Sequence, residues 1–184
     1  MDWGRSHLAH LARRVMERLT HPGNHLRFRG VLHIHSTPSA MRQHINWAIQ
    51  SVLGAETMVN WSLQPKLPGT YRAKLEYRNL ATSGAQIASA LRGWHFLNFE
   101  IVECGENIGE MFRYTPELGM HRAQIDQSGA ILITENQLSN ILKTSLDDQD
   151  LREGINQVIG TAWELELERF RAIGHEEIAS LRAI

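Results

Sequence analysis

The sequence FRGVLHIHSTPSAMRQHINWAIQSVL, residues 28–53, carries the clearest pattern in the chain. Up to residue 35 apolar and polar residues alternate, as they do in a strand with one face toward a core. From Pro38 onward the apolar residues recur at helical spacing, and Thr37 is placed to cap that helix. The stretch therefore predicts a strand, a tight turn and a helix, with His33 and His35 on the strand face away from the core.

Further strands and helices are predicted outward from this unit. Residues 70–78 alternate strictly, which is typical of an antiparallel strand with one solvated face. The order βαββαβ indicates a ferredoxin-like sheet with both helices on one side. Its other side is expected to be an open polar face that includes His33, His35, Arg72 and Lys74. The other elements of this unit are predicted at residues 57–64 (strand), 83–92 (helix) and 95–103 (strand).

The second half of the chain predicts a β-meander followed by helices. Thr134 and Gln137 have the spacing of a capping box at the start of a helix, and Gly160 is expected to bend the helical stripe that follows. The fold class is therefore α+β: a ferredoxin-like βαββαβ sheet extended by a C-terminal meander and helices. Three parts are expected: an N-terminal amphipathic helix extension (1–26), an α+β core domain (27–146) and a helical segment packed on that core (147–184).

Composition and charge exclude several classes of protein. The 184 residues have a formal net charge of −1, so the chain as a whole has no charge-driven affinity for nucleic acid or acidic membranes. The single cysteine, Cys104, permits no disulfide within the chain, and no apolar run approaches the ~20 residues needed to span a bilayer. We expect a cytoplasmic protein with no membrane partner.

The histidine pair has a spacing from which two imidazoles can share a metal ion. His33 and His35 point the same way from a strand, about 7 Å apart at their Cα atoms. No third ligand forms a recognisable motif with them, although His44, His121, Glu76 and Glu100 are available. Structural histidines, or histidines within a contact surface, are the favoured interpretation, and we predict no metal and no cofactor.

Catalytic and nucleic-acid signatures are weak. The chain has no hydrolase elbow, no P-loop and no GxGxxG fingerprint, and Glu103 beside Cys104 should raise the pKa of that thiol. Tyr71 and Tyr77 alternate toward the core, which leaves Phe96 alone on the expected open face. That face therefore lacks the middle-strand aromatics that sheet-based RNA binders use. We therefore predict no catalytic residues and no nucleic-acid partner.

Surface residues of the right chemistry for protein contacts remain. Trp47 and His44 lie off the core stripe of their helix, and aromatic residues that are exposed mark partner surfaces. Trp3 and Trp163, near the two ends, are expected to be exposed in the same way. The predicted binding surface comprises His33, His35, His44, Trp47, Arg72 and Lys74.

Several blocks of sequence, in order, resemble one actinobacterial family of small soluble proteins of unknown function. The resemblance spans Phe28 to Leu142. It implies a role in fatty-acid metabolism, because genes of that family are often found near fatty-acid synthesis genes, and it transfers no catalytic residues. The blocks are RGVLHIHSTPSAM, HINWAIQSVLG, NWSLQPKLPGTYRA, ASALRGWHFLNFEIVE, RYTPELGM and SGAILITENQLS.

Taken with that resemblance, the sequence favours a non-catalytic regulatory or accessory protein of fatty-acid biosynthesis. It would act by protein–protein docking, with an acyl-CoA carboxylase as the first candidate partner. The alternative is a binding protein or small enzyme for an acyl-CoA or acyl-carrier thioester, with His33, His35 and Arg72 lining the site.

Overall fold

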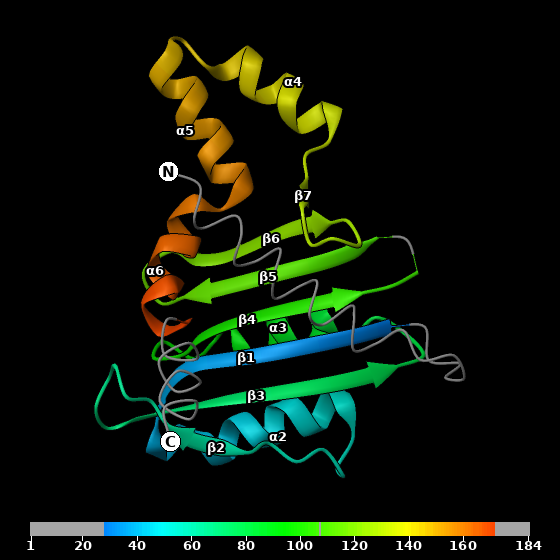
Figure 1. The fold of residues 1–184 in the computed structure, drawn as a ribbon, viewed down its shortest axis with the longest axis vertical. Coiled ribbons are helices and arrows are strands. Elements are labelled where there is room, and N and C mark those ends of the chain that lie inside the picture. Colours follow the sequence, from blue (N-terminus) through cyan, green and yellow to red (C-terminus); the bar gives the residue numbers. More distant parts are fainter. Residues whose placement is uncertain (1–27, 107, 172–184) are drawn as a thin grey trace, which may run out of the picture.

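The computed structural model describes residues 28–106 and 108–171. Within them, one antiparallel sheet of seven strands has the order β2-β3-β1-β4-β5-β6-β7 (Figure 1). The strands are β1 (Phe28–Pro38), β2 (Trp61–Leu63), β3 (Thr70–Asn79), β4 (Asn98–Cys104), β5 (Gly109–Thr115), β6 (Gly119–Ile125) and β7 (Ile131–Leu132). The helices are η1 (Ser39–Met41), α2 (Arg42–Leu53), α3 (Gly84–Leu91), α4 (Glu135–Thr144), α5 (Asp148–Ile159) and α6 (Thr161–Arg171).

The α+β class predicted from the sequence is confirmed. Strands and helices follow the order βαββαβ as far as β4, and β5, β6 and β7 extend the sheet from the β4 edge. The closer relation to ferredoxin-like proteins stays a prediction. The N-terminal helix predicted within residues 1–26, and the segment after residue 171, lie outside the described residues.

The main core lies between the sheet and the two helices α2 and α3, which pack on the same face. Glycine at position 30 allows close approach across the sheet, because a Cβ there would lie 2.6 Å from Cε1 of Tyr77. The ring of Tyr77 thus lies over β1 and closes that end of the core. The fully buried members of this core are Leu32, Ile34, Ile45, Ile49, Ile87, Leu91, Leu97, Phe99 and Ile101.

Helix α6 packs on the opposite sheet face, against β1 and β5 (Figure 1). The expectation of an open polar face is therefore wrong where α6 lies. His35 is buried there, and the apolar side chains of Leu167 and Phe170 are buried with it. The physical reason is that α6 has an apolar stripe of its own, which is removed from water only by packing on the sheet.

Local boundaries differ from the prediction at the first turn. Strand β1 continues through Pro38 and is followed by the short helix η1, so that α2 begins only at Arg42. Thr37 does not cap α2: it lies inside β1, paired with Tyr71 beyond a bulge in the strand. Neither η1 nor α2 has a side-chain N-cap hydrogen bond. The bulge lets the strand extend further than simple alternation indicates.

Three other predictions need correction. The strand expected at 57–64 is only Trp61–Leu63, and Leu63 is exposed although Trp61, two residues earlier, packs against the core. The last strand of the predicted meander, expected at residues 131–134, is only Ile131–Leu132. Trp163 is buried, not exposed: its ring packs on His121, and its indole N–H donates to the carbonyl of Gly119 at 2.9 Å.

Two predicted helix boundaries are confirmed. Thr134 and Gln137 form the capping box at the start of α4. Gly160 adopts the left-handed conformation, with φ +71°, and separates α5 from α6. Because of this break, α6 lies on the sheet while α4 and α5 extend beyond its β7 edge as a helical hairpin (Figure 1).

Candidate functional site

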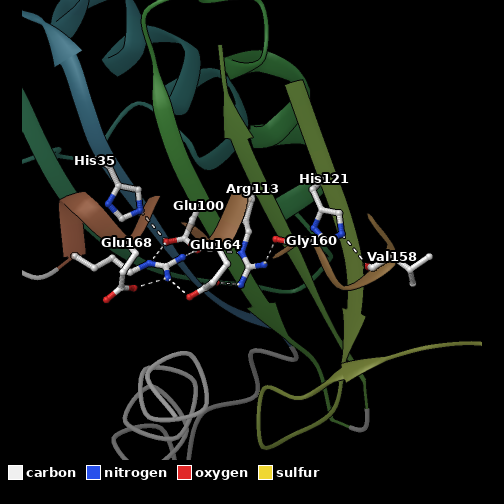
Figure 2. Close-up of polar contacts among 9 residues, drawn as sticks. His35, Glu100, Arg113, His121, Val158, Gly160, Glu164 and Glu168 are labelled. Atoms are coloured by element: carbon white, nitrogen blue, oxygen red, sulfur yellow. Dashed lines mark hydrogen bonds and ion pairs between the residues drawn. The ribbon is translucent and has the colours of Figure 1, made fainter. Parts of the chain in front are cut away.

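The carboxylate of Glu100 lies at the centre of the sheet face that α6 covers. Glu100 is on β4 and almost completely buried. Its oxygens accept hydrogen bonds from His35 Nε2 at 2.7 Å, from Arg171 Nε at 2.9 Å and from Arg113 Nε at 3.4 Å (Figure 2). Three separate elements, β1, β5 and α6, therefore meet at one side chain.

A second carboxylate, Glu164 on α6, lies between the same two arginines. It accepts from Arg113 and from Arg171, and Arg171 also contacts Glu168 at 3.3 Å (Figure 2). Negative and positive groups thus alternate, so each buried charge has an opposite neighbour. We call His35, Glu100, Arg113, Glu164, Glu168 and Arg171 the ion network.

The electrostatics of the ion network fix the charges of Glu100 and Arg171. Burial alone would raise the pKa of Glu100, but Arg171 and the hydrogen bond from His35 outweigh it and hold that pKa well below its usual range. For Arg171, burial lowers the pKa, whereas Glu100 and Glu164 raise it, with a net rise. Glu100 is consequently a carboxylate and Arg171 a guanidinium throughout the neutral range.

His33 lies next to this network on β1. Its ring stacks on that of His35 with centroids 6.1 Å apart, and His35 stacks in turn on Phe170 at 6.1 Å. Burial, and then the charge of His35, lower the pKa of His33 to about 4. His33 is therefore neutral at pH 7.

The geometry of the ion network suits a structural role. Both oxygens of Glu100 are occupied by protein donors, which leaves no free carboxylate oxygen to take a proton from a substrate. No group of three or more His, Cys, Asp or Glu side chains within residues 28–106 and 108–171 is arranged to hold a metal ion. What the network can do is attach α6 to the sheet.

Helix α2 carries a different kind of surface on the other side of the molecule. The side chain of Trp47 is 56% exposed, and the ring of His44 meets it edge-on with centroids 5.4 Å apart. The same His44 ring stacks on Trp94 at 5.8 Å. Phe96, in the same turn as Trp94, is 70% exposed. We call His44, Trp47, Trp94 and Phe96 the aromatic surface.

The structure divides the predicted binding surface into two. His33, Arg72 and Lys74 share one sheet face, where Lys74 is paired with Glu76 at 2.7 Å and Arg72 with Ser62 at 3.3 Å. His35 shares that face but is buried under α6. His44 and Trp47 lie on α2, which packs on the opposite sheet face. The six residues therefore do not form one continuous site.

Sequence reasoning missed most of the ion network and half of the aromatic surface. Arg113, Glu164 and Arg171 look like ordinary exposed charges in the sequence, and only the pairing of β4 with β5 and the position of α6 bring them together. Phe96 was expected on the open face of the sheet; it is exposed, but it lies in the turn before β4.

Cys104 and the neighbouring Glu103 have structural surroundings. Burial, followed by the charge of Glu103, raises the pKa of the Cys104 thiol, as predicted from the sequence. The carboxylate of Glu103 accepts from the backbone N–H groups of Ser83 and Gly84 at 2.8 and 3.0 Å, and so caps the start of α3. Neither residue is prepared for nucleophilic chemistry.

Comparison with known proteins assigns a family without an activity. Residues 31–182 match the model of a family described as "Protein of unknown function (DUF3145)", and the chain belongs to that family. No curated protein and no solved structure matches the chain. In the part of the chain that the structure describes, no helix is both long and apolar enough to cross a bilayer.

Proposed function

We propose that this member of the DUF3145 family is a non-catalytic regulatory or accessory protein of fatty-acid biosynthesis. It acts in the cytoplasm by docking on an enzyme of that pathway, with an acyl-CoA carboxylase as the first candidate. The observation that carries the docking role is the aromatic surface on α2 and the turn before β4. The choice of pathway comes from the resemblance to actinobacterial proteins encoded near fatty-acid synthesis genes.

The aromatic surface has the chemistry of a binding hot spot. Tryptophan is the residue most enriched at positions that dominate binding energy, and it loses little side-chain entropy when it is covered. Trp47 is already oriented by the ring of His44, which is itself held against Trp94. An oriented, exposed tryptophan costs less to immobilise than a free one, which favours affinity.

The helix beneath this surface is firmly anchored. Ile45 and Ile49 on the inner side of α2 are completely buried. The side chain of Asn46 accepts a hydrogen bond from the indole N–H of Trp61 at 3.0 Å, which joins α2 to β2. A docking surface on a rigid element keeps its shape when the partner binds.

The fully paired ion network supports the non-catalytic part of the proposal. An acid–base catalyst needs a group that can reach a substrate proton, and Glu100 and Arg171 are both buried and already engaged within the protein. These contacts explain how α6 is attached to the sheet, and a structural role accounts for them without a catalytic one.

The experiment is a binding assay with purified carboxylase. The full chain is immobilised, and the biotin carboxylase and carboxyltransferase components are passed over it while the dissociation constant is measured. We expect saturable binding that weakens at least tenfold in Trp47→Ala. The matched control is Leu165→Ala, which removes an exposed apolar side chain from α6 and should leave binding unchanged.

Two outcomes count against the proposal. If the chain binds no carboxylase or fatty-acid synthase component, the assignment to fatty-acid biosynthesis is refuted. If Trp47→Ala binds as tightly as the unmodified chain, the aromatic surface is not the docking site. A saturable rise in melting temperature with acetyl-CoA or malonyl-CoA alone would instead support the alternative of a thioester-binding protein.

A further inference from the structure

Large apolar side chains are exposed on α4 and in the segments just before and after it. Ile141 is the buried residue of α4 and packs so closely on α5 that a Cβ at Gly154 would lie 2.8 Å from its Cγ2. The other large apolar side chains on α4 and in these flanking segments are exposed. Leu146 is 94% exposed, and Leu142 is 60% exposed. The apolar row consists of Leu132, Ile133, Leu138, Leu142 and Leu146.

The positions of these residues are symmetric along α4. Leu138 and Leu142 lie two residues before and two residues after Asn140, while Ile133 and Leu146 lie beyond the two ends of the helix. If a second α4 lies antiparallel, with the two helices centred at the height of residue 140, Leu138 of each copy faces Leu142 of the other. Leu146 of each copy then reaches the start of the other helix, beside Ile133.

The charges on α4 favour the same arrangement. Glu135 lies in the first turn and Lys143 in the last, and both are exposed. In an antiparallel pair, Glu135 of one copy lies within about 3 Å, along the helix axis, of Lys143 of the other, at 1.5 Å per residue. A parallel pair would instead place like charges beside each other. Opposite charges that flank an apolar seam select the orientation of paired helices.

We infer that a second copy of this chain docks on the apolar row, forming a two-fold dimer through antiparallel α4 helices. A self-complementary patch is what a two-fold interface requires. A specific interface buries about 1,000 Å² or more in total, and two such rows supply ten large apolar side chains. The proposal does not depend on the identity of the enzyme partner.

The dimer leaves the aromatic surface uncovered. Helix α4 lies at one end of the longest axis of the molecule and α2 at the other (Figure 1). A dimer joined through α4 therefore presents two aromatic surfaces at its outer ends. Such a dimer would bind a partner with two sites more tightly than one chain could, provided that the spacing allows both contacts.

The first test is the mass of the full chain in solution. Sedimentation equilibrium from about 1 to 100 µM, a range that brackets the dissociation constants of moderate interfaces, should show a monomer–dimer equilibrium. Leu142→Asp should raise the dimer dissociation constant at least tenfold. Leu165→Asp, an equally drastic change at an exposed leucine on α6, should leave it unchanged. Circular dichroism checks that both variants are folded; a chain that stays monomeric across this range overturns the proposal.

The second test fixes the orientation. Leu138→Cys and Leu142→Cys are prepared separately and oxidised alone or as an equal mixture, with the unmodified chain as background for the buried Cys104. Antiparallel pairing predicts that the mixture yields more disulfide-linked dimer than either variant alone, because positions 138 and 142 face each other. Efficient crosslinking of each variant with itself, and no gain on mixing, would contradict the antiparallel dimer.

Discussion

Removing the carboxylate of Glu100 should be among the most destabilising single changes in this protein. In Glu100→Ala the guanidinium groups of Arg113 and Arg171 stay buried, with Glu164 as their main remaining partner. Deleting one member of a buried ion pair costs about 3–5 kcal/mol, because an uncompensated charge is left behind. In a chain of this size, that loss corresponds to a fall in melting temperature of roughly 6–20 °C.

The matched control is Glu168→Ala. Glu168 contacts Arg171 at 3.3 Å, but its side chain is 46% exposed, so the expected cost is about 0–1 kcal/mol. Urea unfolding followed by circular dichroism gives the free energy of unfolding of both variants at pH 7. If Glu100→Ala stays within 1 kcal/mol of the unmodified chain, or if Glu168→Ala costs as much, the assignment of the ion network as the attachment of α6 is refuted.

The pH dependence of the contribution of Glu100 to the free energy of unfolding is a further check. Because the pKa of Glu100 is lowered on folding, its contribution is complete above the unfolded value of about 4.3 and is lost as the pH falls through the folded value. Glu100→Gln has no charge to titrate. The stability gap between the unmodified chain and Glu100→Gln should therefore shrink as the pH is lowered below about 4.

Three other results are expected. The free energy of unfolding should fall as the pH drops from about 6.5 to about 4, because the pKa of His33 is about 4 in the folded chain and about 6.5 in the unfolded chain, which therefore protonates His33 first. His33→Gln should flatten this part of the stability profile, measured by urea unfolding. Gly30→Ala should lower the free energy of unfolding by about 1–3 kcal/mol or more, because the added Cβ overlaps the Tyr77 ring. The loss should be clearly smaller in a Tyr77→Leu background, and equal losses in the two backgrounds would contradict the overlap. Cys104 should react with a thiol reagent at least tenfold more slowly in the folded chain than in urea, and labelling at the unfolded rate would contradict its burial and raised pKa.

The sequence predicted correctly those elements whose position depends only on residues close to one another in the chain. The alternation at residues 70–78, the capping box at Thr134 and the break at Gly160 each follow from the preferences of neighbouring residues, and each is confirmed. The first helix start was wrong at Thr37 because a bulge in β1 allows the strand to continue, and a bulge depends on pairing with other strands.

The face covered by α6 could not be predicted by the same means. Glu100 and Arg171 are 71 residues apart in the sequence and form the centre of one buried cluster. Charged residues in a helix usually indicate a solvated face, and nothing local to Arg171 distinguishes it from Arg169, which is exposed. The burial of Trp163 was missed for the same reason, since its partner His121 comes from a distant strand.

The junction at Gly160 connects the ion network to the α4–α5 hairpin. The guanidinium of Arg113 donates to the carbonyl of Gly160 at 3.4 Å, and His121 contacts the carbonyl of Val158 at 2.9 Å, so the end of α5 is held against β5 and β6 (Figure 2). A Cβ at position 160 would also lie 2.7 Å from Nδ1 of His121, so there is no room for a side chain at this position. The hairpin is therefore fixed to the sheet by the same arginine that pairs with Glu100. It follows that Arg113→Ala should weaken association through α4 as well as lower the free energy of unfolding, although Arg113 is not part of the apolar row.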